Sequence, residues 1–368
     1  MKHFKKILCP VLVLLLCSTV VFAQNAVRVY VNGTRVNEDV ILKDGRTYIP
    51  LRAVSEAMGA DVAWDEASFS AHISFTEDDA IAKIVETVSP SVVTIIGNYA
   101  GTNEANKFTN PTVHGSGVIY KSNGYILTNA HVVENIKNLT VVLNNGEVAA
   151  GDLLFSDSTI DLAIVKISKI GLTPITMADA SSIVAGKTAI AIGTPISLSM
   201  RNSVTKGIVS GNGVTVNGSY YKLLQTDAGI NPGNSGGPLL NTKGELIGIN
   251  SSKYTGEGIE SMGFAIPVDT VQYAIAQYEA HGKILRPNFK LTLEQSWEAK
   301  IGLPTTKGLT VAADAAGLLA GDVITAVNGI TVHNLTDWNE ALKSTYNGES
   351  AVLDYTRDGV SAQITIYG

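Results

Sequence analysis

The most informative stretch of the sequence is GINPGNSGGP, residues 229–238. It places Ser235 in a glycine-rich run that begins at Gly233. Glycines around a serine let the backbone approach a substrate closely and direct N–H groups at an oxygen that becomes negative during a reaction. We therefore expect Ser235 to be a nucleophile, with the N–H groups of Gly233 and Ser235 as oxyanion donors.

Two upstream motifs contain the residues that a serine nucleophile requires. A serine hydroxyl is a weak nucleophile at neutral pH, so it needs a base, and the base needs a group that fixes its tautomer. TNAHVV at residues 128–133 contains His131, and DSTIDLAIVKI at residues 157–167 contains Asp161. Each motif alone also fits a structural role, as a strand end, a strand edge or a turn. Together, in this order on a β-rich chain, they predict a triad of His131, Asp161 and Ser235.

The chain around these motifs, from about residue 78 to 282, consists of short apolar runs separated by Gly, Asn and Ser turns. SVVTIIG at residues 91–97 and GSGVIY at 115–120 are examples. Many short strands at regular spacing are typical of a β-barrel or a β-sandwich. The polar residues 100–112 are expected to form a surface loop, and residues 269–278 a closing helix.

The three catalytic motifs resemble those of the HtrA (DegP-like) serine proteases, and so do GSGVIY and MGFAIPVD at residues 262–269. The resemblance covers residues 78–368. It implies a mainly β chain with the chymotrypsin-type double β-barrel, and an ATP-independent serine endopeptidase that cleaves unfolded or misfolded proteins. It also implies a homotrimer or larger assembly that serves protein quality control and the stress response outside the cytoplasm.

The expected substrate pocket contains Gly229, because in this fold the residue six positions before the nucleophile lies at the pocket base. Ile230 stands beside it. Without a carboxylate at the base, the pocket is expected to accept small or medium aliphatic side chains rather than Lys or Arg. Asp227 is close in sequence, and both a cation-recognising and a structural role for it stay open.

Residues 287–368 resemble a bacterial PDZ domain through KGLTV at 307–311 and AGLLAGDVITAVNG at 316–329. PDZ domains bind an extended peptide as an added strand, so the resemblance implies a peptide ligand. The sequence Asn288-Phe289-Lys290-Leu291 stands where the family usually has Tyr-Leu-Gly and an aliphatic residue. Because Lys290 replaces the glycine, a structural or regulatory role for this PDZ-like domain is the alternative.

Residues 24–77 are expected to form a small α+β module. Alternating valines lead into an Asn-Gly pair at residues 32–33, which predicts a tight β-hairpin. GRTYIPLRAVSEAMGADVAWD, residues 45–65, predicts a short helix with Met58 in the core, and it resembles the N-terminal module of copper amine oxidases. One histidine, His72, cannot hold copper alone. We therefore expect a non-catalytic module, and neither a metal nor a cofactor for the whole chain.

The first 23 residues combine three lysines, an apolar run over residues 7–22 and a small-residue pattern that ends at Ala23. This pattern predicts a secretory signal peptide, which is either removed after Ala23 or kept as an anchor. The protein is therefore expected to be extracytoplasmic, secreted or held at the outer face of the cytoplasmic membrane. Both cysteines, Cys9 and Cys17, lie in this segment, so the remainder has no disulfide and no thiol ligand.

The charge of the chain bears on its partners. The net charge is −6 at pH 7, and loss of the lysine-rich signal peptide makes it more negative, so nucleic acid is not an expected partner.

Two rivals to proteolysis are a chaperone that holds unfolded chains without cutting them, and a cell-surface protein whose N-terminal module attaches to the cell wall or a partner. The complete triad favours the peptidase. The expected organisation is signal peptide 1–23, module 24–77, protease domain 78–286 and PDZ-like domain 287–368.

Overall fold

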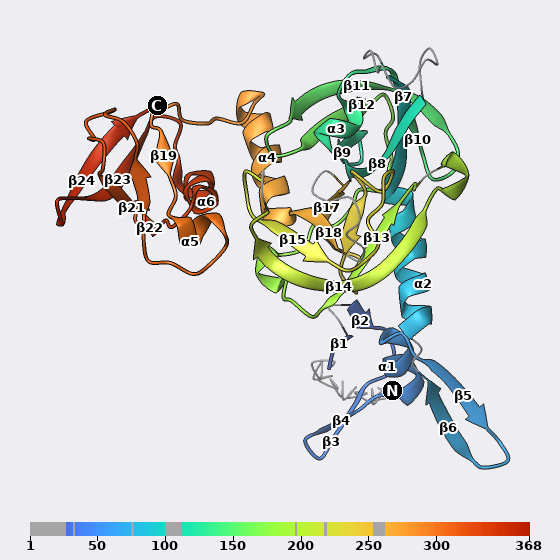
Figure 1. Cartoon of the computed structure of the whole chain (residues 1–368). Helices are drawn as coiled ribbons and strands as arrows, with labels where there is room; N and C mark the ends of the chain where they lie inside the picture. Colours follow the sequence, from blue (N-terminus) through green and yellow to red (C-terminus); the bar gives the residue numbers. More distant parts are fainter. Residues whose placement is uncertain are drawn as a thin grey trace, which may run out of the picture. The chain divides into compact units, whose positions relative to one another are not determined.

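Figure 1 shows the computed structural model of the chain, coloured from the N-terminus to the C-terminus. It describes residues 27–31, 34–74, 77–99, 112–195, 197–216, 219–252 and 262–368. The expected signal peptide and residues 100–111 of the expected surface loop lie outside the described residues. The chain folds into two compact units, Met1–Ala80 and Ile81–Gly368. Among the described residues, no helix is long and apolar enough to cross a membrane.

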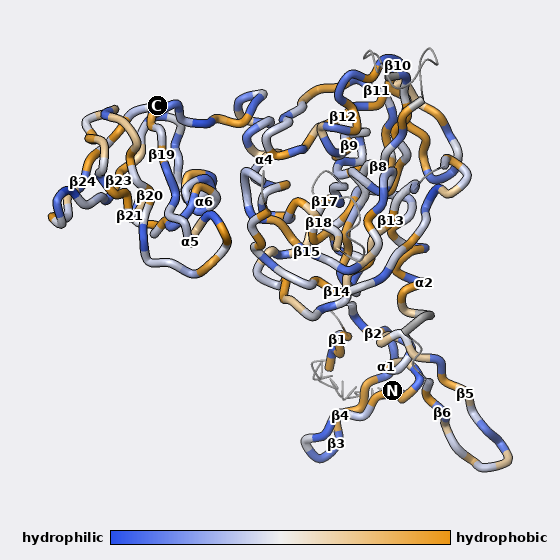
Figure 2. Tube along the Cα trace, in the orientation of Figure 1, coloured by the Kyte–Doolittle hydropathy of each residue, from blue (hydrophilic) through white to orange (hydrophobic). Residues whose placement is uncertain are grey.

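The described residues of the first unit form antiparallel hairpins and one short helix. The first hairpin pairs Val31 with Thr34, as predicted, and the expected turn residues 32–33 lie outside the described residues. Figure 2 shows hydrophilic residues at the tip of the β3–β4 hairpin, where the chain turns in solvent. The elements are β1 Val29–Val31, β2 Thr34–Val36, β3 Ile41–Lys43, β4 Arg46–Tyr48, α1 Leu51–Ala57, β5 Asp61–Asp65 and β6 Ser70–Ser74, and α2 Glu77–Val88 leads into the second unit.

The prediction that Met58 is a core residue is wrong. Its side chain is 52% exposed, just beyond the end of α1. Among the described residues of this unit, only Val36, Ser55 and Ala60 are buried. Helical spacing indicates which face of a helix is apolar, but a module this small offers few neighbours to cover that face.

The second unit begins with a closed barrel of six antiparallel strands in the order β10-β11-β12-β9-β8-β7. Ile95 and Ile119 are fully buried inside it, because alternate residues of a strand face the same side. The elements are the 3₁₀ turn η1 Ser89–Ser91, β7 Val92–Tyr99, β8 Thr112–Lys121, β9 Tyr125–Thr128, α3 Ala130–Val133, β10 Ile136–Val142, β11 Val148–Asp157 and β12 Leu162–Ile167.

A second closed barrel follows, with the strand order β13-β14-β15-β18-β17-β16. The expected closing helix is confirmed as α4, and it ends at Gly282, whose φ of 70° is the left-handed conformation that glycine adopts at helix ends. The elements are η2 Ala180–Ser182, β13 Thr188–Gly193, η3 Leu198–Met200, β14 Ser203–Val214, β15 Leu223–Thr226, β16 Pro238–Leu240, β17 Leu246–Ser251, β18 Gly263–Pro267 and α4 Val268–His281.

One apolar cluster is shared by the two barrels. Leu127 and Ile164 enter it from the first barrel, and Ile190 and Ile249 enter it from the second. Figure 2 shows hydrophobic residues along the second-barrel strands β17 and β18. Truncating a buried leucine or isoleucine in such a core costs about 2–5 kcal/mol. The shared core therefore fixes the barrels against each other and holds the loops at their junction.

The rest of the second unit is a six-stranded sheet, ordered β19-β20-β21-β23-β24 with β22 on β21. It has its own core, in which Leu309, Ile324 and Leu353 are fully buried. Lys290 has a φ of 56°, so this lysine takes a left-handed conformation that costs a non-glycine residue roughly 1–2 kcal/mol. The elements are β19 Leu293–Glu294, α5 Trp297–Lys300, β20 Leu309–Val311, β21 Val323–Val327, β22 Ile330–Thr331, α6 Leu335–Thr345, β23 Ser350–Arg357 and β24 Val360–Tyr367.

Candidate active site

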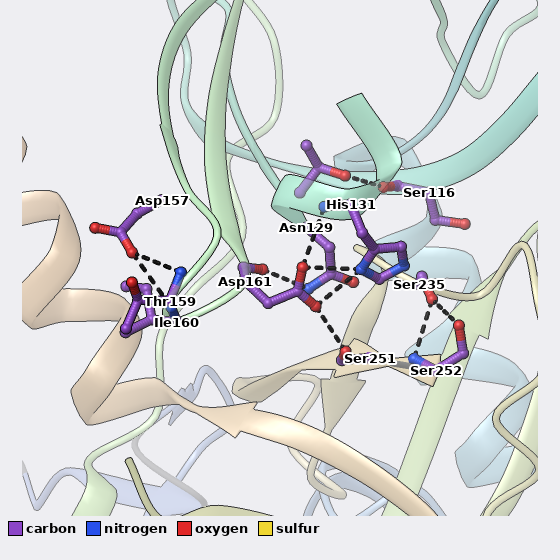
Figure 3. Close-up of polar contacts among 11 residues, drawn as sticks. Ser116, Asn129, His131, Asp157, Thr159, Ile160, Asp161, Ser235, Ser251 and Ser252 are labelled. Carbon is purple, nitrogen blue, oxygen red and sulfur yellow. Dashed lines mark hydrogen bonds and ion pairs between the residues drawn. The ribbon is translucent and has the colours of Figure 1, made fainter. Parts of the chain in front are cut away.

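The three residues of the predicted triad come from loops of both barrels. His131 lies on α3, Asp161 ends the turn between β11 and β12, and Ser235 lies in the glycine-rich turn before β16. Figure 3 shows the three side chains close together. The backbone N–H of Ser116 on β8 donates to the Ser235 carbonyl at 2.8 Å. This bond ties the serine turn of the second barrel to the first barrel.

His131 and Asp161 pair closely. Nδ1 of His131 lies 2.8 Å from Oδ1 and 2.9 Å from Oδ2 of Asp161. A carboxylate at Nδ1 favours the tautomer with its proton on Nδ1, which leaves Nε2 to act as a base. The His131 side chain is 33% exposed and that of Asp161 is 1% exposed. A substrate can therefore reach the imidazole, while the carboxylate stays away from water.

The buried carboxylate of Asp161 receives a full set of hydrogen bonds. Besides Nδ1, the backbone N–H of His131 donates to Oδ1 at 3.1 Å, and the Ser251 hydroxyl donates to Oδ2 at 2.8 Å. Asp161 has a φ of 57°, which is uncommon for a non-glycine residue. Asn129 Nδ2 donates to the Asp161 carbonyl at 2.9 Å. These bonds compensate for burial of the charge and hold the strained backbone in place.

The Ser235 hydroxyl is engaged by Ser252. The two Oγ atoms lie 2.6 Å apart, and the backbone N–H of Ser252 donates to Ser235 Oγ at 3.1 Å. Within the described residues, no hydrogen bond joins Ser235 to His131. In Figure 3 the Ser235 hydroxyl lies beside the imidazole, but both of its dashed lines run to Ser252.

The turn that presents Ser235 requires glycine at position 233. Gly233 has a φ of 100°, and a Cβ there would lie 2.1 Å from the Thr194 carbonyl oxygen. The Ser116 hydroxyl donates to the Gly233 carbonyl at 2.7 Å and accepts from the Thr194 N–H at 3.0 Å. In the part of the chain that the structure describes, the N–H groups of Gly233 and Ser235 have no hydrogen-bond partner. Both donors are therefore available to an oxyanion.

Gly229 and Ile230 lie at the start of the same turn. The Gly229 carbonyl accepts from the Thr205 hydroxyl at 3.0 Å, and Ile230 is 9% exposed. Asp227 is exposed, and its carboxylate accepts from the Ile208 N–H at 2.6 Å. The structure therefore gives Asp227 a backbone-binding role.

No metal site was found among the residues described. No group of three or more His, Cys, Asp or Glu side chains in those ranges lies close enough together to hold a metal ion. His72 is an exposed residue 3.9 Å from Asp65. The Nε2 atom of His114 is buried without a hydrogen-bond partner in the described part of the chain. Among the described residues, no hydrogen bond joins either histidine to Ser235 Oγ.

Comparison with family models finds a match in each part of the chain. Residues 115–249 match the trypsin-like peptidase domain, residues 309–367 match the PDZ domain, and residues 18–84 match the copper amine oxidase N-terminal domain. The chain is 34% identical over 341 residues to the serine protease Do-like HtrA of Lactococcus lactis subsp. cremoris, which covers 80% of this chain and 84% of that relative.

The chain belongs to the HtrA family of serine proteases. Another family member, the serine protease Do-like HtrB of Bacillus subtilis, is 36% identical over 318 residues, covering 77% of this chain and 69% of the relative. Among solved structures, the HtrA-type protease AlgW with decapeptide has a TM-score of 0.65 and 28% identity, covering 78% of this chain and 97% of that chain. The serine endoprotease from Yersinia pestis has a TM-score of 0.60 and 30% identity, covering 78% and 96%.

These findings confirm the expected family and fold. The HtrA chain is a serine endopeptidase with a chymotrypsin-type double barrel, a C-terminal PDZ domain and a small N-terminal module related to that of copper amine oxidases. Four site residues, however, were missed in the sequence: Ser116, Asn129, Ser251 and Ser252. Ser116 lies in GSGVIY and Asn129 lies in TNAHVV, so polar residues within these motifs were the available signal for the two. Ser251 and Ser252 lie at the end of the buried strand β17.

Proposed function

We propose that this HtrA-family peptidase is exported and hydrolyses unfolded or misfolded polypeptides without ATP, through an acyl-enzyme on Ser235. The observation that carries the proposal is the pairing of His131 Nδ1 with both carboxylate oxygens of Asp161, at 2.8 and 2.9 Å. The pairing orients Nε2 as a base next to a serine in a glycine-rich turn. Serine acylation requires a base that is oriented in this way beside the nucleophile.

The first half of the reaction forms the acyl-enzyme. Nε2 of His131 takes the hydroxyl proton of Ser235 while Oγ attacks the carbonyl carbon of the scissile bond. The carbonyl oxygen becomes negative and accepts hydrogen bonds from the N–H groups of Gly233 and Ser235. His131 then gives its proton to the leaving amine, and the carbon–nitrogen bond breaks. The acyl group remains as an ester on Ser235.

The second half releases the acyl group. His131 takes a proton from a water molecule, whose oxygen attacks the ester carbon, and then returns the proton to Ser235 Oγ as the ester bond breaks. Asp161 stays ionised throughout and stabilises the imidazolium form of His131. Three hydrogen bonds to its carboxylate, from His131 Nδ1, His131 N–H and Ser251, support that role.

The substrate pocket is proposed to include Gly229 and Ile230 and to favour aliphatic residues before the cleaved bond. Gly229 offers no charge at the pocket base, and Ile230 is apolar. Unfolded chains expose such residues in extended form, so they are the proposed substrates. The PDZ domain is proposed to bind a peptide, and the left-handed φ of Lys290, 56°, gives its backbone the conformation that a glycine would provide.

The cellular setting is also a proposal. Residues 1–23 serve as a signal peptide or anchor, followed by the module 24–77, the protease domain 78–286 and the PDZ domain 287–368. The enzyme acts outside the cytoplasm in protein quality control and the stress response, as a homotrimer or larger assembly. Association with the cell wall or membrane surface follows from the N-terminal segments.

Cleavage of casein tests the catalytic proposal. Ser235→Ala and His131→Ala should each lower the rate by several orders of magnitude, and Asp161→Asn should lower turnover by about 10⁴-fold. Ser168→Ala is the matched control, because Ser168 is exposed and lies outside the site. A folded Ser235→Ala protein that still degrades casein at a near-normal rate would refute the assignment, and a chaperone without protease activity would show no degradation by the wild type.

A further inference from the structure

Two consecutive serines contact different members of the proposed triad. Ser251, at the end of β17, donates to Asp161 Oδ2 at 2.8 Å. Ser252, the next residue, contacts Ser235 Oγ with its hydroxyl at 2.6 Å and with its backbone N–H at 3.1 Å. Ser251 is the last residue of β17 and Ser252 lies just beyond the strand, and the two side chains contact two different groups of the site.

The contacts with Ser252 have a consequence for attack. A serine nucleophile needs its proton directed at the base and a lone pair directed at the substrate carbonyl. In the described residues, Ser235 Oγ forms its hydrogen bonds with Ser252 rather than with His131. The Ser252 N–H occupies one lone pair of Oγ, and the Ser252 hydroxyl occupies either the other lone pair or the proton. The Ser235 hydroxyl must therefore break its hydrogen bonds with Ser252 before it can attack.

We propose that Ser252 is a positioning residue that holds Ser235 in a resting orientation, from which Ser235 must turn toward His131 before acylation. The inference rests on the proposed role of Ser235 as the nucleophile. The resting orientation is favoured by one hydrogen bond between hydroxyl groups in a partly buried place, in addition to the backbone N–H. Such a bond is worth roughly a two- to tenfold population difference. Removing the Ser252 hydroxyl should therefore speed acylation by about that factor.

The test is the second-order rate constant for labelling of the full-length protein with diisopropyl fluorophosphate. In this reaction Ser235 Oγ bonds to phosphorus, fluoride leaves, and the hydroxyl proton passes through His131 to solvent. Ser252→Ala should label Ser235 about two to ten times faster than the wild type. The turnover number on a short aliphatic peptide should rise with it, while KM changes little, because the resting contact involves the nucleophile and not the peptide.

A pair of variants of equal size separates the effect of the hydroxyl on the labelling rate from the effect of side-chain packing. Ser252→Thr keeps a hydroxyl and should label like the wild type, whereas Ser252→Val has nearly the same shape without it and should label faster. This pair also serves if Ser252→Ala folds poorly. Ser251→Ala is a contrasting neighbour, and it should slow labelling because it removes a donor to Asp161.

The outcomes distinguish the inference from the function on which it rests. Faster labelling of the alanine and valine variants, with Thr at the wild-type rate, supports Ser252 as a resting contact. Wild-type labelling at Ser235 with equal or slower labelling of both hydroxyl-free variants overturns the inference and leaves the triad intact. Failure of the folded wild type to label at Ser235 overturns the triad, and the role of Ser252 with it.

Discussion

Arg286 donates two hydrogen bonds, of 2.7 and 3.0 Å, to the carboxylate of Asp157, which lies 129 positions earlier in the sequence. Asp157 also accepts from the backbone N–H groups of Thr159, at 3.0 Å, and Ile160, at 3.3 Å. These bonds shape the turn that ends at Asp161, as Figure 3 shows for the Asp157 side. Burial lowers the pKa of Arg286, but the hydrogen bond and charge of Asp157 outweigh it and leave the pKa raised. Arg286 thus stays charged and supports the loop that carries the proposed catalytic aspartate.

Arg286→Met should therefore reduce both stability and turnover. The side chains of Arg286 and Asp157 are 25% and 11% exposed, and an unpaired, largely buried carboxylate costs about 2–4 kcal/mol. The free energy of unfolding, from urea titration, should fall by that amount. Turnover on a short peptide should fall more than KM changes, since the altered turn holds Asp161 and not the substrate.

An exposed ion pair of the same unit provides the control. Lys83 and Glu86 lie 2.8 Å apart with side chains 75% and 72% exposed, so Lys83→Met should cost less than about 1 kcal/mol. If Arg286→Met is no more harmful than Lys83→Met, the Asp157 contact does not support the site.

The dependence of activity on pH should follow from the need for a neutral His131. The imidazole must be uncharged at Nε2 to accept the proton of Ser235. The value of kcat/KM on a short peptide is therefore expected to be lower in acid, where a histidine base is lost to protonation. A profile that stays flat down to pH 4 is incompatible with a histidine base.

The pocket assignment predicts cleavage after Val, Ala or Ile far more often than after Lys or Arg. A Cβ at Gly229 would come no closer than 3.5 Å to another atom, the Thr205 methyl group, so Gly229→Asp can be accommodated. That variant should gain cleavage after Arg and Lys, whereas the uncharged Gly229→Asn should not. Mass-spectrometric maps of casein fragments test both points, and a wild-type map dominated by basic sites would show that the pocket is misassigned.

Tyr221, which is buried, and Tyr120, which is partly buried, should make the second unit sensitive to alkali. The pKa of Tyr221 is raised above its ordinary value of 10.0, mainly by burial and to a smaller extent by the nearby Tyr273. The pKa of Tyr120 is also raised, mainly by burial and to a smaller extent by the charge of Glu279. A raised pKa in the folded state means that the stabilisation is complete below pH 10 and is lost as pH rises toward the raised values. Above pH 10, the free energy of unfolding should fall by about 1.4 kcal/mol per pH unit for each such tyrosine.

Circular dichroism during urea titration at several pH values measures that slope. Tyr221→Phe should reduce the slope. Tyr367→Phe should not, because Tyr367 is 76% exposed. An equal slope in the wild type and Tyr221→Phe would contradict the burial argument.

The sequence allowed prediction of features with local signatures. Short β-runs between turns predicted a β-barrel or a β-sandwich, and the resemblance to HtrA proteases implied the double barrel. His131, Asp161 and Ser235 each stand in a compact motif. Hydrogen bonds between distant segments have no such signature. Neither the Ser235–Ser252 pair nor the Arg286–Asp157 pair could be predicted. Strand periodicity indicates which face of a strand a side chain lies on, but not which residue it contacts across a barrel.

The claim that Ser235 is the nucleophile is tested most directly by locating the adduct of diisopropyl fluorophosphate in the native full-length protein. Digestion and tandem mass spectrometry should find the phosphoryl group on Ser235 in the wild type and in Ser168→Ala, in step with the loss of casein cleavage. No adduct should form in Ser235→Ala or in denatured protein. Full loss of activity with the group on another residue, or persistent casein cleavage by a protein fully labelled at Ser235, would contradict the account.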